Sequence, residues 1–188
     1  MLGLRGSAGA ALKSYNMERV AIFSAGLFAW TLVEYAIHAW LGHTFKTFAT
    51  PLHDVHHRDP HAVFTIRAWI PIALSWLAGF AIFGWGPGMI FFSGIAAGFA
   101  AYEAIHYRVH FSTPSCRAEA HLRLRHLVHH NCEPLACFGV TSELWDLIFG
   151  TELMGEPMAA NCEKVANLPP LAGATNVGKI FQFGGVGR

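Results

Sequence analysis

The most constraining feature of this sequence is the apolar stretch between Arg67 and Glu103. Its 35 residues, 68–102, include no charged residue and no histidine, and a single membrane-crossing helix needs only about 20. The Gly-Trp-Gly-Pro-Gly cluster at 84–88 predicts a turn in the middle. Buried helices of a soluble bundle would show a polar stripe, and these segments show none. We therefore expect a hairpin of two membrane spans, at about 68–83 and 89–107.

A further apolar segment, residues 20–42, is long enough to form a first span. Three basic residues, Arg5, Lys13 and Arg19, precede it, as they do in signal peptides. No small-x-small cleavage site follows, so we expect a retained span after an N-terminal segment, residues 1–19.

The composition excludes several classes of protein. Only 13% of the 188 residues are charged and 53% are hydrophobic, whereas a soluble domain carries about 25% charged residues. The net charge of +1 argues against a nucleic-acid partner. We expect an all-α fold, an integral membrane helical bundle over residues 20–151. Shorter helices are predicted at 118–130 and 143–149, and residues 152–188 are predicted to be a C-terminal tail.

The basic residues predict the orientation of the chain. Three spans would place the 42–67 loop and everything after Glu103 on one side, together with ten of the thirteen Lys and Arg. The positive-inside rule makes that side cytoplasmic. The four cysteines form no CxxC pair and are expected to be reduced thiols on the same side.

Histidine is unusually frequent, with twelve residues, and ten of them fall into four spaced groups. Spacings of i, i+3, i+4 put imidazoles on one helix face. The predicted topology brings all four groups to one membrane face, as a histidine-rich helical cap. The groups are His38 and His43; His53, His56 and His57; His106 and His110; and His126, His129 and His130.

Ten imidazoles exceed what one ion can use, so the spacing predicts a site for two metal ions with about five ligands each. Imidazole suits iron, copper and zinc alike. Because His38 and His43 are five residues apart, we expect the helix to end or bend at Gly42. Glu34 and Glu103 lie one helical turn before ligands, where each can accept the proton of a second ring nitrogen. His61 and His121 stand alone and are expected to be ordinary solvated histidines.

The order of these motifs resembles the fatty acid hydroxylase and sterol desaturase superfamily, nearest its fatty acid hydroxylase branch. The resemblance covers residues 34–151 and includes a closing Gly-Val-Thr-Ser-x2-Trp-Asp-x2-Phe-Gly-Thr string at 139–151. It implies a membrane-bound monooxygenase with two iron ions, or zinc as isolated. Such an enzyme uses O2 and two electrons to hydroxylate a C–H bond of a fatty-acyl or related lipid in lipid biosynthesis.

The resemblance also has departures and alternatives. Some relatives carry a histidine where this chain has Phe111, and some carry a fused haem domain, for which this chain has no room. Electrons are therefore expected from a separate cytochrome b5 or ferredoxin with its reductase. A sterol or carotenoid hydroxylase or desaturase of the same superfamily fits the residues equally well. A membrane metal transporter or sensor is the alternative from another class, but transporters place ligands near the bilayer midplane.

Overall fold

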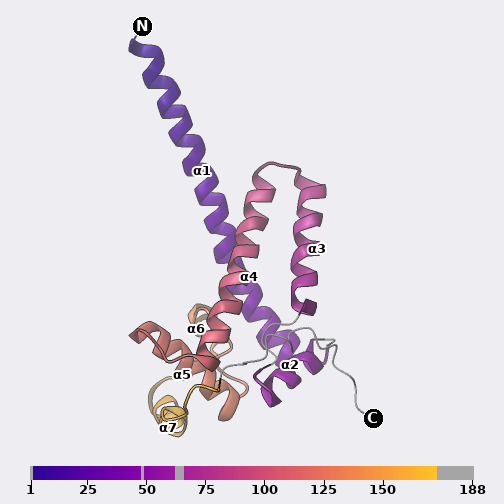
Figure 1. Ribbon diagram of the computed structural model, residues 1–188, viewed down its shortest axis with the longest axis vertical. Coiled ribbons are helices and arrows are strands. Elements are labelled where there is room, and N and C mark those ends of the chain that lie inside the picture. The colour runs from indigo at the N-terminus through magenta and orange to yellow at the C-terminus, as the bar shows by residue number, and fades with distance from the viewer. Residues whose placement is uncertain (1, 48, 62–65, 173–188) are drawn as a thin grey trace. The chain divides into compact units, whose positions relative to one another are not determined.

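Helices make up all the regular secondary structure in the part of the chain that the structure describes, residues 2–47, 49–61 and 66–172 of a computed structural model (Figure 1). This agrees with the predicted all-α class. In order, the elements are α1 (Leu2–Tyr35), the π-helix η1 (Ala36–Thr44), α2 (Thr50–Arg58), α3 (Ile66–Phe83), α4 (Pro87–Phe111), α5 (Arg117–Asn131), α6 (Leu144–Phe149) and α7 (Gly155–Val165).

Two helical stretches are long and apolar enough to cross a membrane, Lys13–Thr44 and Pro87–Phe111. In the most apolar 18 residues of each helix, only 22% and 28% are buried within the molecule, whereas the core helix of a soluble protein is mostly buried. The apolar part of α3, Ile70–Phe83, is shorter. The predicted hairpin is present as α3 and α4, and three membrane crossings remain a prediction.

The turn between α3 and α4 has the residues its backbone requires. Gly84 has a φ of +63°, a conformation that glycine adopts without steric cost. Pro87 begins α4, where its missing N–H has no intrahelical acceptor to lose. The glycine-rich cluster at 84–88 therefore forms the predicted turn between the two helices.

The chain divides into two units. The first comprises Met1–Trp30 and Pro71–Phe99, and small residues let its helices approach closely. A Cβ at Gly26 would lie 2.0 Å from the carbonyl oxygen of Phe91, and one at Gly94 would lie 2.2 Å from that of Phe23. Helices α1 and α4 thus touch through their backbones.

We expect Gly94→Val to disrupt this contact. The valine methyl groups have no space beside the Phe23 carbonyl, so α1 and α4 must separate, and overpacking costs about 1–3 kcal/mol or more. Thermal unfolding in detergent should show a lower midpoint. Gly86→Ala is the control, because the nearest atom to its Cβ is 3.7 Å away. Equal midpoints for the two variants would contradict the close approach.

The second unit, Thr31–Ile70 and Ala100–Arg188, contains all ten grouped histidines. Helices α5 and α6 match the predicted segments at 118–130 and 143–149. Part of the predicted tail is ordered: residues 155–165 form α7, which packs against α5. The backbone N–H of Leu171 donates to the His110 carbonyl, so the chain after α7 returns to the end of α4. The rest of the predicted tail, 173–188, lies outside the described residues.

Candidate metal centre

The ten histidines form two groups of five, drawn from η1, α2, α4 and α5. Within each group one ring nitrogen from every residue lies within 4.8 Å of the others. The first histidine group is His38, His43, His53, His57 and His129. The second histidine group is His56, His106, His110, His126 and His130. The number of groups and their size match the prediction, and ligation of a metal remains a prediction.

The sequence triplets are divided between the groups. On α2, His53 and His57 face the first histidine group, whereas His56 belongs to the second. On α5, His129 belongs to the first group, and His126 and His130 to the second. Residues four apart thus share a group, and the third member of each triplet turns to the other one. The stacked rings of His57 and His130, with centroids 4.2 Å apart, show that the groups adjoin.

The π-helix η1 explains how His38 and His43 reach one site. In an α-helix, residues five apart point about 140° away from each other. A π-helix closes i to i+5 hydrogen bonds, so its turns are wider and such residues lie on the same side of the helix. The predicted end of the helix at Gly42 is wrong, since the helical turns continue to Thr44. Gly42 has a different role: a Cβ there would lie 3.2 Å from the His53 ring.

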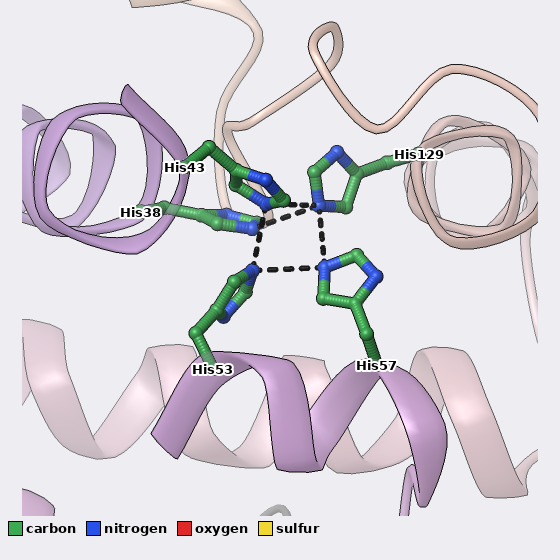
Figure 2. Close-up of side chains that lie close together, drawn as sticks. All are labelled: His38, His43, His53, His57 and His129. Atoms are coloured by element: carbon green, nitrogen blue, oxygen red, sulfur yellow. Dashed lines mark hydrogen bonds between the residues drawn. The ribbon is translucent and has the colours of Figure 1, made fainter. Parts of the chain in front are cut away.

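Figure 2 shows the first histidine group, in which the rings point toward one another from separate helices. The Nε2 atom of His129 lies 3.0 Å from that of His38, 3.2 Å from that of His43 and 3.1 Å from that of His57. His53 completes the group, with its Nε2 atom 2.7 Å from that of His43 and 2.8 Å from that of His57.

The second histidine group is more buried, with four of its five members largely inaccessible to solvent. The Nε2 atom of His126 is 3.1 Å from that of His106 and 2.9 Å from that of His110. The Nε2 atom of His110 is in turn 3.3 Å from that of His56.

These spacings fit a metal ion better than hydrogen bonds among the imidazoles. A neutral Nε2 atom either donates one proton or offers one lone pair, so His129 cannot bond three ring nitrogens at once. Ligands bound at right angles at about 2.1 Å are about 3 Å apart, as these nitrogens are. A cation would therefore relieve the mutual repulsion of the lone pairs.

The protonation state of the histidines also suits metal binding. Burial, together with neighbouring imidazoles, lowers the pKa of His53 and His56 to about 2 and that of His57 to about 4. The same causes hold the pKa of His126 and His129 well below the usual value. At neutral pH these imidazoles are uncharged, which is the form that ligates metals.

The two predicted carboxylates occupy different settings. Among the described residues Glu34 bonds none of the ten grouped histidines: its Oε1 atom accepts the backbone N–H groups of Val140 and Thr141, at 2.7 and 2.9 Å, and its Oε2 atom accepts the Thr141 hydroxyl. The direct carboxylate–imidazole contact predicted for it is therefore wrong. Glu103 is buried, and its Oε2 atom has no hydrogen-bond partner among the described residues. Its role remains a prediction.

A backbone turn at residues 136–138, here called the carbonyl turn, replaces the expected carboxylates. Its Phe138 carbonyl accepts a hydrogen bond from His38 Nδ1 at 2.5 Å, and its Ala136 carbonyl accepts one from His129 Nδ1 at 2.9 Å. Cys137 between them has a φ of +56°, so the two flanking carbonyls can both reach imidazoles. Because a carbonyl only accepts, both rings carry the proton on Nδ1 and direct the Nε2 lone pair at the group.

Sequence reasoning missed a buried ion network that anchors the carbonyl turn. Asp146 accepts the backbone N–H groups of Phe138 and Gly139, at 2.8 and 2.7 Å. Arg125, fully buried, donates to Asp146 at 2.8 Å and to Glu152 at 2.5 Å. The only signal in the sequence is the position of Arg125 on the histidine-bearing helix and of Asp146 in the closing string.

The two solitary histidines lie apart from both groups, as predicted. His61 bonds Asp59 at 2.9 Å, and His121 bonds Glu143 at 2.7 Å, both on the surface. His121 is thus a useful neighbour of the site on α5 that takes no part in it.

Comparison with known proteins gives concordant matches. The fatty acid hydroxylase family model matches residues 23–151. The dihydroceramide fatty acyl 2-hydroxylase FAH1 of Arabidopsis thaliana is 31% identical over 71% of this chain and 61% of its own length. The ceramide very long chain fatty acid hydroxylase scs7 of Schizosaccharomyces pombe is 32% identical over 71% of this chain and 42% of its own.

A solved structure also matches. The protein described as full-length scs7p, with only its hydroxylase domain visible, superposes with a TM-score of 0.63 at 29% identity, over 78% of this chain and 61% of the other. The chain therefore spans less than two thirds of the length of these relatives.

Proposed function

Because the chain belongs to the fatty acid hydroxylase family, we propose that it is an oxidoreductase that hydroxylates a C–H bond of a fatty-acyl or related lipid chain in lipid biosynthesis. The observation that carries this proposal is the convergence of ten histidines in two groups, all inside the matched segment, 23–151. Relatives named as 2-hydroxylases favour the 2-position of the acyl chain as the site of attack.

Two iron ions are the cofactor that we propose, with zinc as an alternative in the isolated protein. The first histidine group would hold one ion and the second histidine group the other. Bound iron would supply the activation of O2 with two electrons from an external donor, cytochrome b5 or ferredoxin with its reductase. The protein's own contribution is to keep the imidazoles neutral and fixed in direction and to exclude water from the more buried group.

An exposed apolar surface formed by η1 and α6 suits a lipid chain. Trp40 follows His38 on η1 and is 40% exposed, and its ring packs against Phe149 of α6 with centroids 5.7 Å apart. Phe149 and the adjacent Ile148 are 46% and 57% exposed. Because exposed apolar surface of this kind favours lipid over water, we propose that the acyl chain approaches the site here.

The names of the relatives favour this function over the alternatives. Names that specify fatty acids and ceramides favour an acyl substrate over a sterol or carotenoid. Their description as hydroxylases gives no support to a metal transporter or sensor.

We further propose that both histidine groups lie on the cytoplasmic side of the membrane, and native cysteines can test this. A membrane-impermeant maleimide should label Cys116, which is exposed, only after the cells are opened. Cys137 is an internal control, because burial raises the pKa of its thiol to about 11 and keeps it unreactive in the folded protein. Labelling of Cys116 in intact cells would reverse the orientation.

The activity itself is tested with ¹⁸O2. The iron-loaded chain, expressed with a competent electron donor, should yield 2-hydroxy acyl lipids that carry one ¹⁸O atom in the new hydroxyl group. Mass spectrometry of total lipids gives both the mass shift and the position. Absence of any oxidised lipid from a strain that holds the folded, iron-loaded protein would contradict the proposal.

A further inference from the structure

The two histidine groups differ in the hydrogen-bond partners of the ring nitrogens that face away from the site. In the first histidine group, the Nδ1 atoms of the two most buried members, His38 and His129, both donate to the carbonyl turn, at 2.5 and 2.9 Å. The other three members are only half-buried, so water can reach their rings. Every ring of this group therefore has an acceptor or solvent for its N–H.

The second histidine group lacks this support. Within the ranges that the structure describes, the Nδ1 atoms of His56, His106 and His126 are buried and have no hydrogen-bond partner. A metal ion withdraws electron density from its imidazole and makes the remaining N–H more acidic, so an acceptor at that N–H strengthens binding of the metal. Buried imidazoles without such an acceptor do not gain this added affinity for the metal.

The buried ion network holds the carbonyl turn in place through hydrogen bonds. Asp146 accepts the backbone N–H group of Phe138, in the turn, and that of Gly139, the next residue, and Arg125 adds a 2.8 Å bond to the Gly139 carbonyl. Thr151 donates to Asp146 at 2.7 Å, and its own carbonyl accepts the N–H of Cys137 at 2.9 Å. Every residue of the network contacts the turn or a neighbour of the turn, and within the described ranges no side chain of the network forms a hydrogen bond with a member of the second histidine group.

We propose that the two metal sites are unequal: the first histidine group, oriented by the carbonyl turn and its buried Arg125–Asp146 anchor, binds its ion at least about tenfold more tightly than the second. The factor is the lower end of the effect usually seen when the partner of a ligating histidine is removed. This inference rests on the proposed two-metal function. Arg125, Asp146 and Thr151 are accordingly positioning residues, which act on the ion through the turn and two imidazoles.

Equilibrium binding has to be measured, because the half-buried first histidine group exchanges ions with solvent more readily than the buried second one. The full chain in detergent is equilibrated with Zn²⁺ at a series of buffered free concentrations, and bound zinc is counted per chain. The wild type should show two steps of one ion each, separated by about tenfold or more in free Zn²⁺.

Variants of single ligands assign the two steps. His43→Ala should remove the step at low free Zn²⁺, because His43 belongs to the first histidine group. His130→Ala should remove the step at high free Zn²⁺. The reverse assignment, or a single step of two ions in the wild type, would overturn the proposal.

Variants of the anchor test the positioning role. Arg125→Met should move the tighter step to about tenfold higher free Zn²⁺ or beyond, without moving the weaker one. The milder Thr151→Val removes one hydrogen bond to Asp146 and should shift the same step in the same direction, so the test survives if the first variant fails to fold.

Arg123→Met is the matched control, because Arg123 lies on the same helix but donates to the carbonyls of Val109 and Leu168 beside the second histidine group. It should leave the tighter step in place. A general loosening of α5 would instead move both steps in all three variants, and that result would reject the proposal.

The metal experiment contains neither lipid nor O2, so the two proposals can fail separately. Two well-separated steps in a protein that hydroxylates nothing would keep the inequality and remove the function. A single two-ion step in an active enzyme would keep the function and remove the inequality.

Discussion

Replacing His129 by alanine is expected to remove one of the two proposed metal ions and to abolish the proposed lipid hydroxylation. Its Nε2 atom is the most connected in the first histidine group, within 3.0–3.2 Å of three other imidazole nitrogens. Its Nδ1 atom is also one of the two that the carbonyl turn orients. The variant therefore loses a ligand and an anchor together, and we expect bound metal to fall from about two ions to one per chain.

The matched control is His121→Ala, on the same helix. His121 is exposed and bonds the surface residue Glu143, so its removal should leave both the metal content and the activity close to those of the wild type. Metal analysis and lipid profiling of the same preparations check both expectations. Retention of two ions by His129→Ala would contradict the ligand assignment, and loss of metal from His121→Ala would show that α5 tolerates no substitution.

Much of this architecture follows from local sequence patterns. The apolar stretch and its glycine-rich turn predict α3 and α4 within a few residues, because hydrophobic length and turn chemistry are local properties. The spacing of the histidines predicts which ten converge, because helical periodicity decides which side chains share a face.

What the sequence could not supply depends on tertiary contacts. Whether His56 joins His53 or the residues of α4 depends on how α2 packs, and the spacing in the triplet is the same in either case. The π-helix is a second example, since no residue in 36–44 demands it and the spacing of His38 and His43 only hints at an irregular turn.

The partners of the ring nitrogens were missed for a related reason. Carboxylates near ligands in the sequence were the natural candidates, but backbone carbonyls carry no sequence signature. The network that fixes those carbonyls joins α5 to residues more than 20 positions later in the chain, so spacing alone could not reveal it.

The buried network leads to a large expected effect on stability. Asp146 is fully buried, bonds Arg125 at 2.8 Å and accepts two backbone N–H groups of the 138–139 segment. In Asp146→Ala the guanidinium keeps Glu152 but loses a partner, and the two N–H groups are left without an acceptor. Each buried N–H group left without an acceptor costs about 1–3 kcal/mol, and the weakened ion pair adds to this, so we expect a loss of about 3–5 kcal/mol in all.

Thermal unfolding and limited proteolysis of the detergent-solubilised protein measure that cost. The Asp146→Ala variant should unfold at a clearly lower temperature and be cut in the 136–142 segment, whereas Glu143→Ala, which removes the carboxylate of an exposed pair, should change stability by less than about 1 kcal/mol. The comparison separates burial from charge, since both variants delete one acidic group from the same part of the chain. If the two lose equal stability, the network does not hold the carbonyl turn, and the orientation of His38 and His129 must depend on the packing of η1 and α5 instead.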